Sequence, residues 1–220
     1  MRMMTKRLFL ALAAAAPLAG HAFAQSSAQP GSAAQPGSPA QSSDVPVRLR
    51  GKIDAVSGDT LHLTLRDGDK ASAALPADMR VTWLTAAKPG DIAKGSYIGT
   101  AAIPQPDGTL RALEVQVFPP SMRGIGEGSR PFDVAPGSTM TNGTIGSMVS
   151  ANGRTLTVTY KGGEKKVFVP DGVPFVSYAP ADRSALTPGA NVIVNAVRTP
   201  DGTVTARSVL VGQNGLVPPM

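Results

Sequence analysis

Two stretches of 26 residues decide the fold: IAKGSYIGTAAIPQPDGTLRALEVQV at positions 92–117 and LTPGANVIVNAVRTPDGTVTARSVLV at positions 186–211. They align without a gap at an offset of 94 residues, nine of the 26 positions are identical, and both contain PDGT. Further upstream, with small slips, GKI at 51–53 aligns with GTI at 143–145. Self-similarity of this kind indicates repeated units. We therefore predict one duplicated unit of about 74 residues, at positions 45–118 and 139–212.

Inside each unit, apolar residues recur at every second position. The runs TLHLTLR at 60–66 and TLTVTYK at 155–161 both alternate in this way. Side chains of a strand point to alternate faces, so the pattern predicts strands with one buried and one solvated face. Asp67-Gly68, Gly162-Gly163 and the Asp-Gly pair of each PDGT motif are suited to tight hairpin turns.

The order of these segments predicts an all-β fold. We expect about five strands in each unit, with a short helical turn after the third strand, at 85–94 and 179–188, where Ala, Asp, Lys and Pro interrupt the alternation. This order is typical of an OB-like barrel, although a small sandwich or an SH3-like barrel has nearly the same pattern. The prediction is two tandem OB-like five-stranded small barrels, each close to the lower size limit for a single core.

A Gly/Pro-rich segment at 119–138, PPSMRGIGEGSRPFDVAPGS, joins the two units. A connection of this length is either a flexible linker or an ordered strap. Because the segment contains the apolar residues Met122, Ile125, Phe132 and Val134, we expect a strap that packs on the barrels. Residues 213–220 then form a C-terminal tail.

The N-terminal residues predict export. Residues 1–24 combine a basic start, an apolar run too short to span a bilayer and a final Ala-Phe-Ala, so we expect a signal peptide cleaved after Ala24 and a periplasmic protein. The Sec and twin-arginine routes both stay open. Residues 25–44, which are almost entirely Gln, Ser, Pro, Ala and Gly, predict a disordered tether. No later stretch is long and apolar enough to predict a membrane span.

Composition argues against several classes of function. The chain has no cysteine, which excludes thiol catalysis and Cys-type zinc sites. Loss of residues 1–24 removes three basic residues and leaves a net charge of about +3, so the sequence does not predict nucleic-acid binding. His62 is the one histidine after the signal peptide, and the acids are scattered, mostly in turns. We predict no catalytic residue, metal site or cofactor; a hydrolase with an unrecognised carboxylate pair remains an alternative.

Two groups of charged residues are candidates for contact with a partner or an anion. One is the alternating set that one face of the first strand would present. The other lies in the strap, around GIGEG at 124–128. The candidate residues are Arg48, Arg50, Lys52, Arg123, Glu127, Arg130 and Asp133.

Three strings carry a resemblance to a known family: MRGIGEGSRPFD at 122–133, STMTNGTI at 138–145 and TYKGGEKKVFVP at 159–170. With the tandem units, they resemble a family of exported proteobacterial proteins built from a repeated small β-barrel domain of unknown function. Relatives are often labelled automatically as metal transport permeases, a label at odds with the lack of a predicted span after residue 24. The family pattern has His at the positions of Gln116 and Ser129 and Trp at that of Phe132, so any metal site that the resemblance implies lacks its histidines in this chain.

Together these features predict an exported, non-enzymatic binding or interaction protein whose partner is a protein or small ligand of the cell envelope. The alternative is an accessory protein in envelope metal or anion homeostasis.

Overall fold

The computed structural model of the protein describes residues 44–150 and 154–220. The predicted signal peptide at 1–24, and the predicted tether at 25–44 except Asp44, lie outside the described residues. The described residues belong to one unit of the chain, Ser42–Met220. Among them, no helix has the length and apolar character needed to cross a membrane.

The fold is all-β, as predicted. Its strands are β1 (Val45–Ser57), β2 (Thr60–Leu65), β3 (Lys70–Ala74), β4 (Arg80–Ala87), β5 (Tyr97–Pro104), β6 (Leu110–Val117), β7 (Gly128–Pro131), β8 (Thr139–Ser150), β9 (Arg154–Tyr160), β10 (Gly163–Val169), β11 (Phe175–Ala181), β12 (Asn191–Arg198) and β13 (Val204–Gly212). The helical segments among the described residues are short 3₁₀ turns: η1 (Pro89–Asp91), η2 (Pro120–Met122), η3 (Arg183–Ala185) and η4 (Gln213–Gly215).

The two halves of the chain contain the same series of elements. Each has six strands, β1–β6 and β8–β13, with a 3₁₀ turn between the fourth and fifth strand. The turns lie inside the predicted segments 85–94 and 179–188, but the expected count of five strands was wrong. In the first half the alternating pattern is weak in β3, whose sequence KASAA offers no large apolar side chain.

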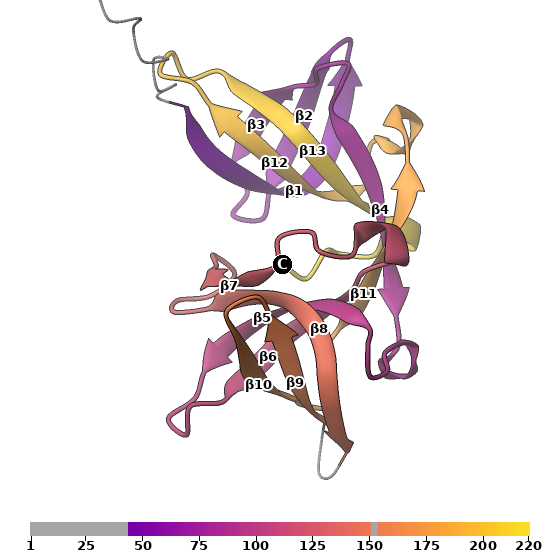
Figure 1. The fold of residues 1–220 in the computed structure, drawn as a ribbon. Coiled ribbons are helices and arrows are strands. Elements are labelled where there is room, and N and C mark those ends of the chain that lie inside the picture. The colour runs from indigo at the N-terminus through magenta and orange to yellow at the C-terminus, as the bar shows by residue number, and fades with distance from the viewer. Residues whose placement is uncertain (1–43, 151–153) are drawn as a thin grey trace, which may run out of the picture. The chain divides into compact units, whose positions relative to one another are not determined.

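Strand pairing crosses from one half to the other (Figure 1). Strand β1 pairs antiparallel with β2 and with β12, β12 pairs with β13, and β13 meets β3 in parallel, which closes the ring β1-β2-β3-β13-β12. Equivalent pairings close a second ring, β8-β9-β10-β6-β5. Each ring takes three strands from one half and the last hairpin from the other. The two halves have therefore exchanged hairpins.

This exchange is a feature of the strand pairing that the sequence repeat did not predict. Residues 45–118 and 139–212 are repeats in sequence, but neither closes a ring with its own strands alone. The physical reason is that the hairpins β5–β6 and β12–β13 are alike, so either could pair with β1 or with β8. The sequence repeat specifies the kinds of strand that pair and leaves open which copy supplies them.

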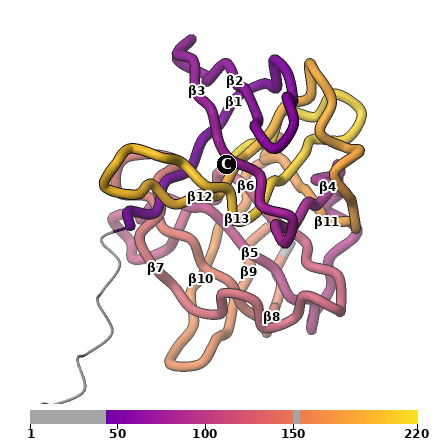
Figure 2. The backbone as a smooth tube through the Cα atoms, turned by 90° about the horizontal axis from the view of Figure 1, so that it is seen from above, coloured from indigo at the N-terminus to yellow at the C-terminus, as the bar shows by residue number. Residues whose placement is uncertain are grey.

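Strands β4 and β11 connect the two rings. They pair with each other antiparallel over seven residues, from Val81 opposite Ala181 to Ala87 opposite Phe175. Each also runs parallel to the last strand of a neighbouring ring, β4 beside β13 and β11 beside β6. Both ribbon and tube views show β4 and β11 side by side (Figures 1 and 2).

The apolar residues form three cores. The alternate residues Leu61, Leu63, Leu156 and Val158 are fully buried inside the two rings, which confirms the alternation in the sequence. A third cluster lies outside both rings, and its buried members are Leu84, Ala101, Met140, Val176, Ile193 and Met220. Because these residues come from both halves and from the end of the chain, this third core joins the rings.

The segment 119–138 packs on the third core. Within it, β7 pairs antiparallel with β8, and Phe132 and Val134 pack against the cluster. The other two apolar residues, Met122 and Ile125, line the pocket described below, and Ile125 is 48% exposed.

Candidate functional site

A pocket of about 540 Å³ lies beside the third core, and we call it the junction pocket. Its lining combines basic side chains with aromatic ones: Arg48, Arg80, Arg130, Phe118, Phe132 and Tyr178. These residues come from β1, β4 and β11, from the strap and from the end of β6. The volume falls within the range of small-molecule sites.

A β-bulge in β6 directs polar side chains toward this region. Strand β6 shifts register against β5 between Ala101 and Ala102. On one side of the shift Ala112 faces the core of the second ring, and on the other side Val115 does so. Successive strand side chains alternate in direction, so Glu114 and Gln116 share the opposite face of β6, outside the ring. Gln116 lines the junction pocket and is only 3% exposed.

Aromatic rings form one wall of the pocket. Phe118 stacks on Tyr178 with ring centroids 5.1 Å apart and an interplanar angle of 12°. Tyr97 packs against the same phenylalanine at 5.4 Å with a tilt of 50°. Stacked and tilted rings at these distances give a rigid apolar surface.

The hydroxyl of Tyr178 anchors Gln116. It donates a hydrogen bond to Gln116 Oε1, and Gln116 Nε2 in turn donates to the sulfur of Met220 at 2.8 Å. Burial raises the pKa of Tyr178, and the nearby charge of Glu114 raises it further. The phenol therefore stays protonated at physiological pH and acts as a fixed donor.

Glu114 is the least compensated polar side chain of the region. It is 1% exposed, and neither carboxyl oxygen has a hydrogen-bond partner among the described residues. Desolvation raises its pKa to about 7, although the nearby amide of Gln116 and the charges of Arg50 and Arg66 act in the opposite direction. A buried acceptor without a partner is costly, and such groups are rare in folded proteins.

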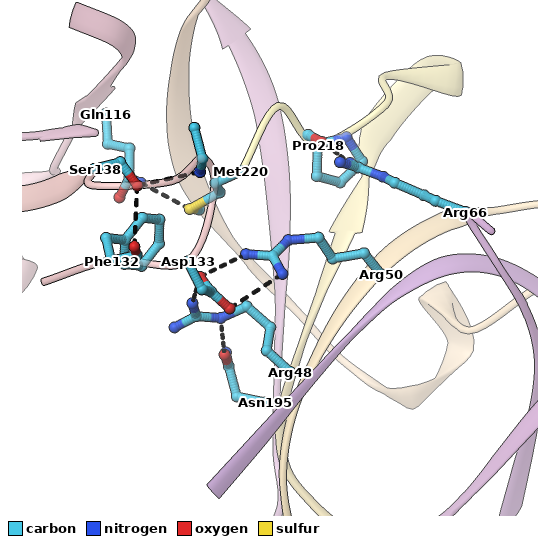
Figure 3. Close-up of polar contacts among 11 residues, drawn as sticks. Arg48, Arg50, Arg66, Gln116, Phe132, Asp133, Ser138, Asn195, Pro218 and Met220 are labelled. Carbon is cyan, nitrogen blue, oxygen red and sulfur yellow. Dashed lines mark hydrogen bonds and ion pairs between the residues drawn. The ribbon is translucent and has the colours of Figure 1, made fainter. Parts of the chain in front are cut away.

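Two arginines of β1 converge on Asp133 of the strap (Figure 3). Arg48 reaches Asp133 Oδ1 at 2.5 Å, and Arg50 contacts both carboxylate oxygens, at 2.8 and 3.2 Å. Arg48 also donates to Asn195 Oδ1 at 3.0 Å and lies over the ring of Phe132 at 4.7 Å. Burial raises the pKa of Asp133, but the hydrogen bond from Arg50 and the two positive charges outweigh it and lower that pKa. The strap is thus tied electrostatically to β1.

The structure brings together four of the seven residues singled out from the sequence. Arg48 and Arg50 meet Asp133, and Arg130 lines the same pocket as Arg48 while donating to the carbonyl of Gly126 at 2.7 Å.

The other three lie apart from this group. Lys52 is exposed further along β1. Arg123 donates to the carbonyl of Gly95 at 2.7 Å, and Glu127 accepts from the backbone N–H of Lys161 at 2.8 Å. These two contacts position the GIGEG turn and leave Arg123 and Glu127 outside the pocket lining.

Sequence reasoning missed Tyr178 and Met220, which line the site, and Glu114, which shares a strand face with Gln116 beside it. The available signal was the polar pair Glu114 and Gln116 at i and i+2 within the otherwise apolar strand ALEVQV. A strand buried on both faces places such a pair against other protein.

The end of the chain enters this region as well. After β13 the chain reverses at Asn214 and Gly215, both with positive φ, and returns toward the third core. Arg66 donates to the carbonyl oxygen of Pro218, and the side chain of Met220 is buried in the cluster beside Gln116 (Figure 3).

No group of three or more His, Cys, Asp or Glu side chains suited to a metal ion occurs within residues 44–150 and 154–220. Comparisons with protein-family models, with curated proteins and with solved structures each found no match. The resemblance carried by the strings at 122–133, 138–145 and 159–170 therefore stays a prediction.

Proposed function

We propose that the protein is an exported, non-enzymatic binding protein of the cell envelope and that the junction pocket is its ligand site. The observation that carries the proposal is the composition of the pocket: three arginines and a stacked aromatic wall, with no acidic residue among its described lining residues. Ligand sites typically combine an apolar lining with a few directed polar groups.

The lining favours a ligand with an apolar body and an anionic group. Phe118 and Tyr178 supply the apolar wall, and the guanidinium groups of Arg80 and Arg130 supply donors that match carboxylate or phosphate oxygens. Arg48 contributes less free charge because Asp133 already pairs with it. A hydrolase would need two carboxyl groups facing one cleft, and the described lining offers none.

The two rings are proposed to be OB-like barrels. Each is a closed ring of five strands in which the last strand runs parallel to the third, and a short helical turn precedes the exchanged hairpin. Five-stranded barrels of this class commonly serve as binding modules. A periplasmic location follows from the proposed signal peptide, and sequencing of the exported protein is expected to show Gln25 as its first residue.

A matched ligand series tests the proposed site. Octanoate, octanol and octylamine share one apolar chain and differ in charge, so calorimetry on the full chain is expected to detect octanoate binding most strongly. Substitution of Arg80 or Arg130 by Gln should weaken octanoate binding several-fold. Lys52→Gln removes an exposed positive charge outside the pocket and serves as the control.

Two results would contradict the site: equal binding of octanoate and octylamine, or an equal loss in Lys52→Gln. Inorganic phosphate alone is a further probe, because an accessory role in anion homeostasis predicts that phosphate binds without any apolar chain. Binding of phosphate with no gain from the octyl chain would favour that alternative.

A further inference from the structure

We propose that the junction pocket, together with the hollow lined by Arg66, Asn191 and Pro218, is a groove for an extended peptide, and that Leu216–Met220 is a built-in, displaceable occupant of that groove. This proposal rests on the proposed function, since it takes the pocket to be a ligand site and names the ligand class.

The segment Leu216–Met220 lies against the protein as a bound extended peptide does. Pro218 and Met220 are buried, whereas Val217 is 57% exposed. Alternate side chains therefore point inward. Residues 216–220 take part in no strand pairing of the described sheet. The segment is therefore extended and independent of the ladder that holds β13.

Side chains of the body hold the segment at a few points. Arg66 donates to the carbonyl oxygen of Pro218, and Gln116 Nε2 donates to the sulfur of Met220 at 2.8 Å. Immediately before the segment, Asn191 Nδ2 donates to the carbonyl oxygen of Gly215 at 3.3 Å. Donors aimed at the carbonyls of an extended chain, together with a pocket for an alternate side chain, are the means by which grooves recognise peptides.

The resident segment leaves acceptors of the region unused. Both oxygens of Glu114 and Oδ1 of Asn142 have no partner among the described residues, and the two side chains are 1% and 4% exposed. Asn142 lines the pocket, and Glu114 shares a strand face with Gln116 and interacts electrostatically with Arg66. Gln116 and Arg66 are the two side chains that hydrogen-bond to Met220 and Pro218 of the resident segment.

Proline explains why the resident segment does not satisfy these acceptors. Pro218 and Pro219 have no backbone N–H, so this part of the segment has no main-chain donor to offer. A peptide of similar shape with N–H groups at these two positions would supply donors to Glu114 and Asn142 while its apolar side chain replaces Met220. Such a peptide should therefore bind more tightly than the chain's own end.

The test uses the full chain and three synthetic peptides, each acetylated and amidated: GLVPPM, GLVAAM, and GLVAAM with both alanines N-methylated. In the variant Met220→Asp a charge replaces the buried side chain and releases the segment. By fluorescence anisotropy, this variant is expected to bind GLVAAM at least tenfold more tightly than the N-methylated peptide. The unsubstituted chain should bind GLVAAM at least tenfold more weakly than Met220→Asp does.

Two further variants make the test specific. Val217→Asp alters an exposed residue of the same segment and is expected to behave as the unsubstituted chain. Glu114→Leu, combined with Met220→Asp, should reduce the preference for free N–H groups over N-methyl groups. If Met220→Asp fails to fold by near-ultraviolet circular dichroism, Arg66→Ala replaces it, because it removes the contact with Pro218 without adding a charge.

The proposal is overturned if no peptide binds the released chain, if N-methylation makes no difference, or if Val217→Asp releases the groove as well as Met220→Asp does. Octanoate binding separates this proposal from the proposed function. Octanoate binding without peptide binding would reject the groove alone, whereas peptide binding without octanoate binding would reject only the anion preference of the pocket.

Discussion

Gly51 and Gly143, which align in the sequence repeat, meet the same steric constraint in the two rings. A Cβ atom at Gly51 would lie 2.3 Å from the carbonyl oxygen of Thr64, and one at Gly143 would lie 2.4 Å from that of Thr159. Both contacts are to backbone, which cannot rotate away. The close approach of β1 to β2 and of β8 to β9 thus depends on the absence of a side chain.

Alanine at either position should destabilise the protein. We expect Gly51→Ala and Gly143→Ala each to lower the free energy of unfolding by about 1–3 kcal/mol, since overpacking forces the strands apart. Urea denaturation measures the change. Gly90→Ala is the control because a Cβ there meets no atom within 4 Å, and a loss as large as that of Gly51→Ala would contradict the steric explanation.

The PDGT turns make a different prediction. Gly108 and Gly202 have φ of +81° and +87°, and a Cβ at either would have no neighbour within 4 Å. Valine should therefore cost about 1 kcal/mol or more through backbone conformation alone. Thermal unfolding of Gly108→Val and Gly202→Val measures this, and an unchanged melting temperature would contradict the role of these glycines in the hairpins.

Glu114 should make stability depend on pH. Its pKa in the folded state is about 7, whereas the ordinary value for a glutamate is about 4.5. Between these two pH values the carboxyl group is protonated in the folded state and ionised in the unfolded state. Stability is then expected to fall as the pH rises through this range and to level off above it. The loss amounts to up to ~3 kcal/mol.

Comparison with Glu114→Gln isolates this effect. The variant lacks the titrating group, so its stability should change less between pH 5 and 8 than that of the unsubstituted chain. The pKa values of Asp54, Asp107, Asp133, Asp182 and Asp201 are lowered, and these groups affect stability at more acidic pH. Chemical denaturation measures the free energy of unfolding of both proteins from pH 5 to 8. If that free energy changes equally with pH in the two proteins, the result contradicts a buried, titrating Glu114.

The exchange of hairpins predicts complementation between fragments. Fragments 44–118 and 119–220 each hold strands whose partners belong to the other, because β1 pairs with β12 and β5 pairs with β8. Mixed after refolding, they are expected to form a 1:1 complex with a higher melting temperature than either fragment. Size-exclusion chromatography with light scattering reads the stoichiometry. If the two fragments are stable monomers that do not associate, each half closes a ring with its own strands.

Much of the local structure was predictable from the sequence because it depends on neighbouring residues. The alternation in 60–66 and 155–161 marked strands whose apolar residues are buried, and Asp67-Gly68 marked a turn where Gly68 has φ of +94°. The third core and the junction pocket were not predictable in this way. Their walls include Arg48 of β1 and Asn195 of β12, which are 147 residues apart, and only the exchanged pairing brings such residues together.

The junction pocket also depends on differences between the repeats that the alignment conceals. At the offset of 94 residues, Glu114 corresponds to Ser208 and Gln116 to Leu210. The equivalent strand faces thus carry different chemistry where both border the third core. Similarity within the repeat predicted the strands, and divergence within it places unlike side chains beside the junction pocket.

Hairpin exchange also sets the order of events during biosynthesis. The first ring needs β12 and β13, the last two strands within the described residues, as partners for β1 and β3. A ribosome synthesises the chain from its N-terminus, so β1, β2 and β3 emerge long before the strands that complete their ring. An incomplete ring with an open edge must therefore persist, or be shielded by a chaperone, until β12 and β13 have been synthesised.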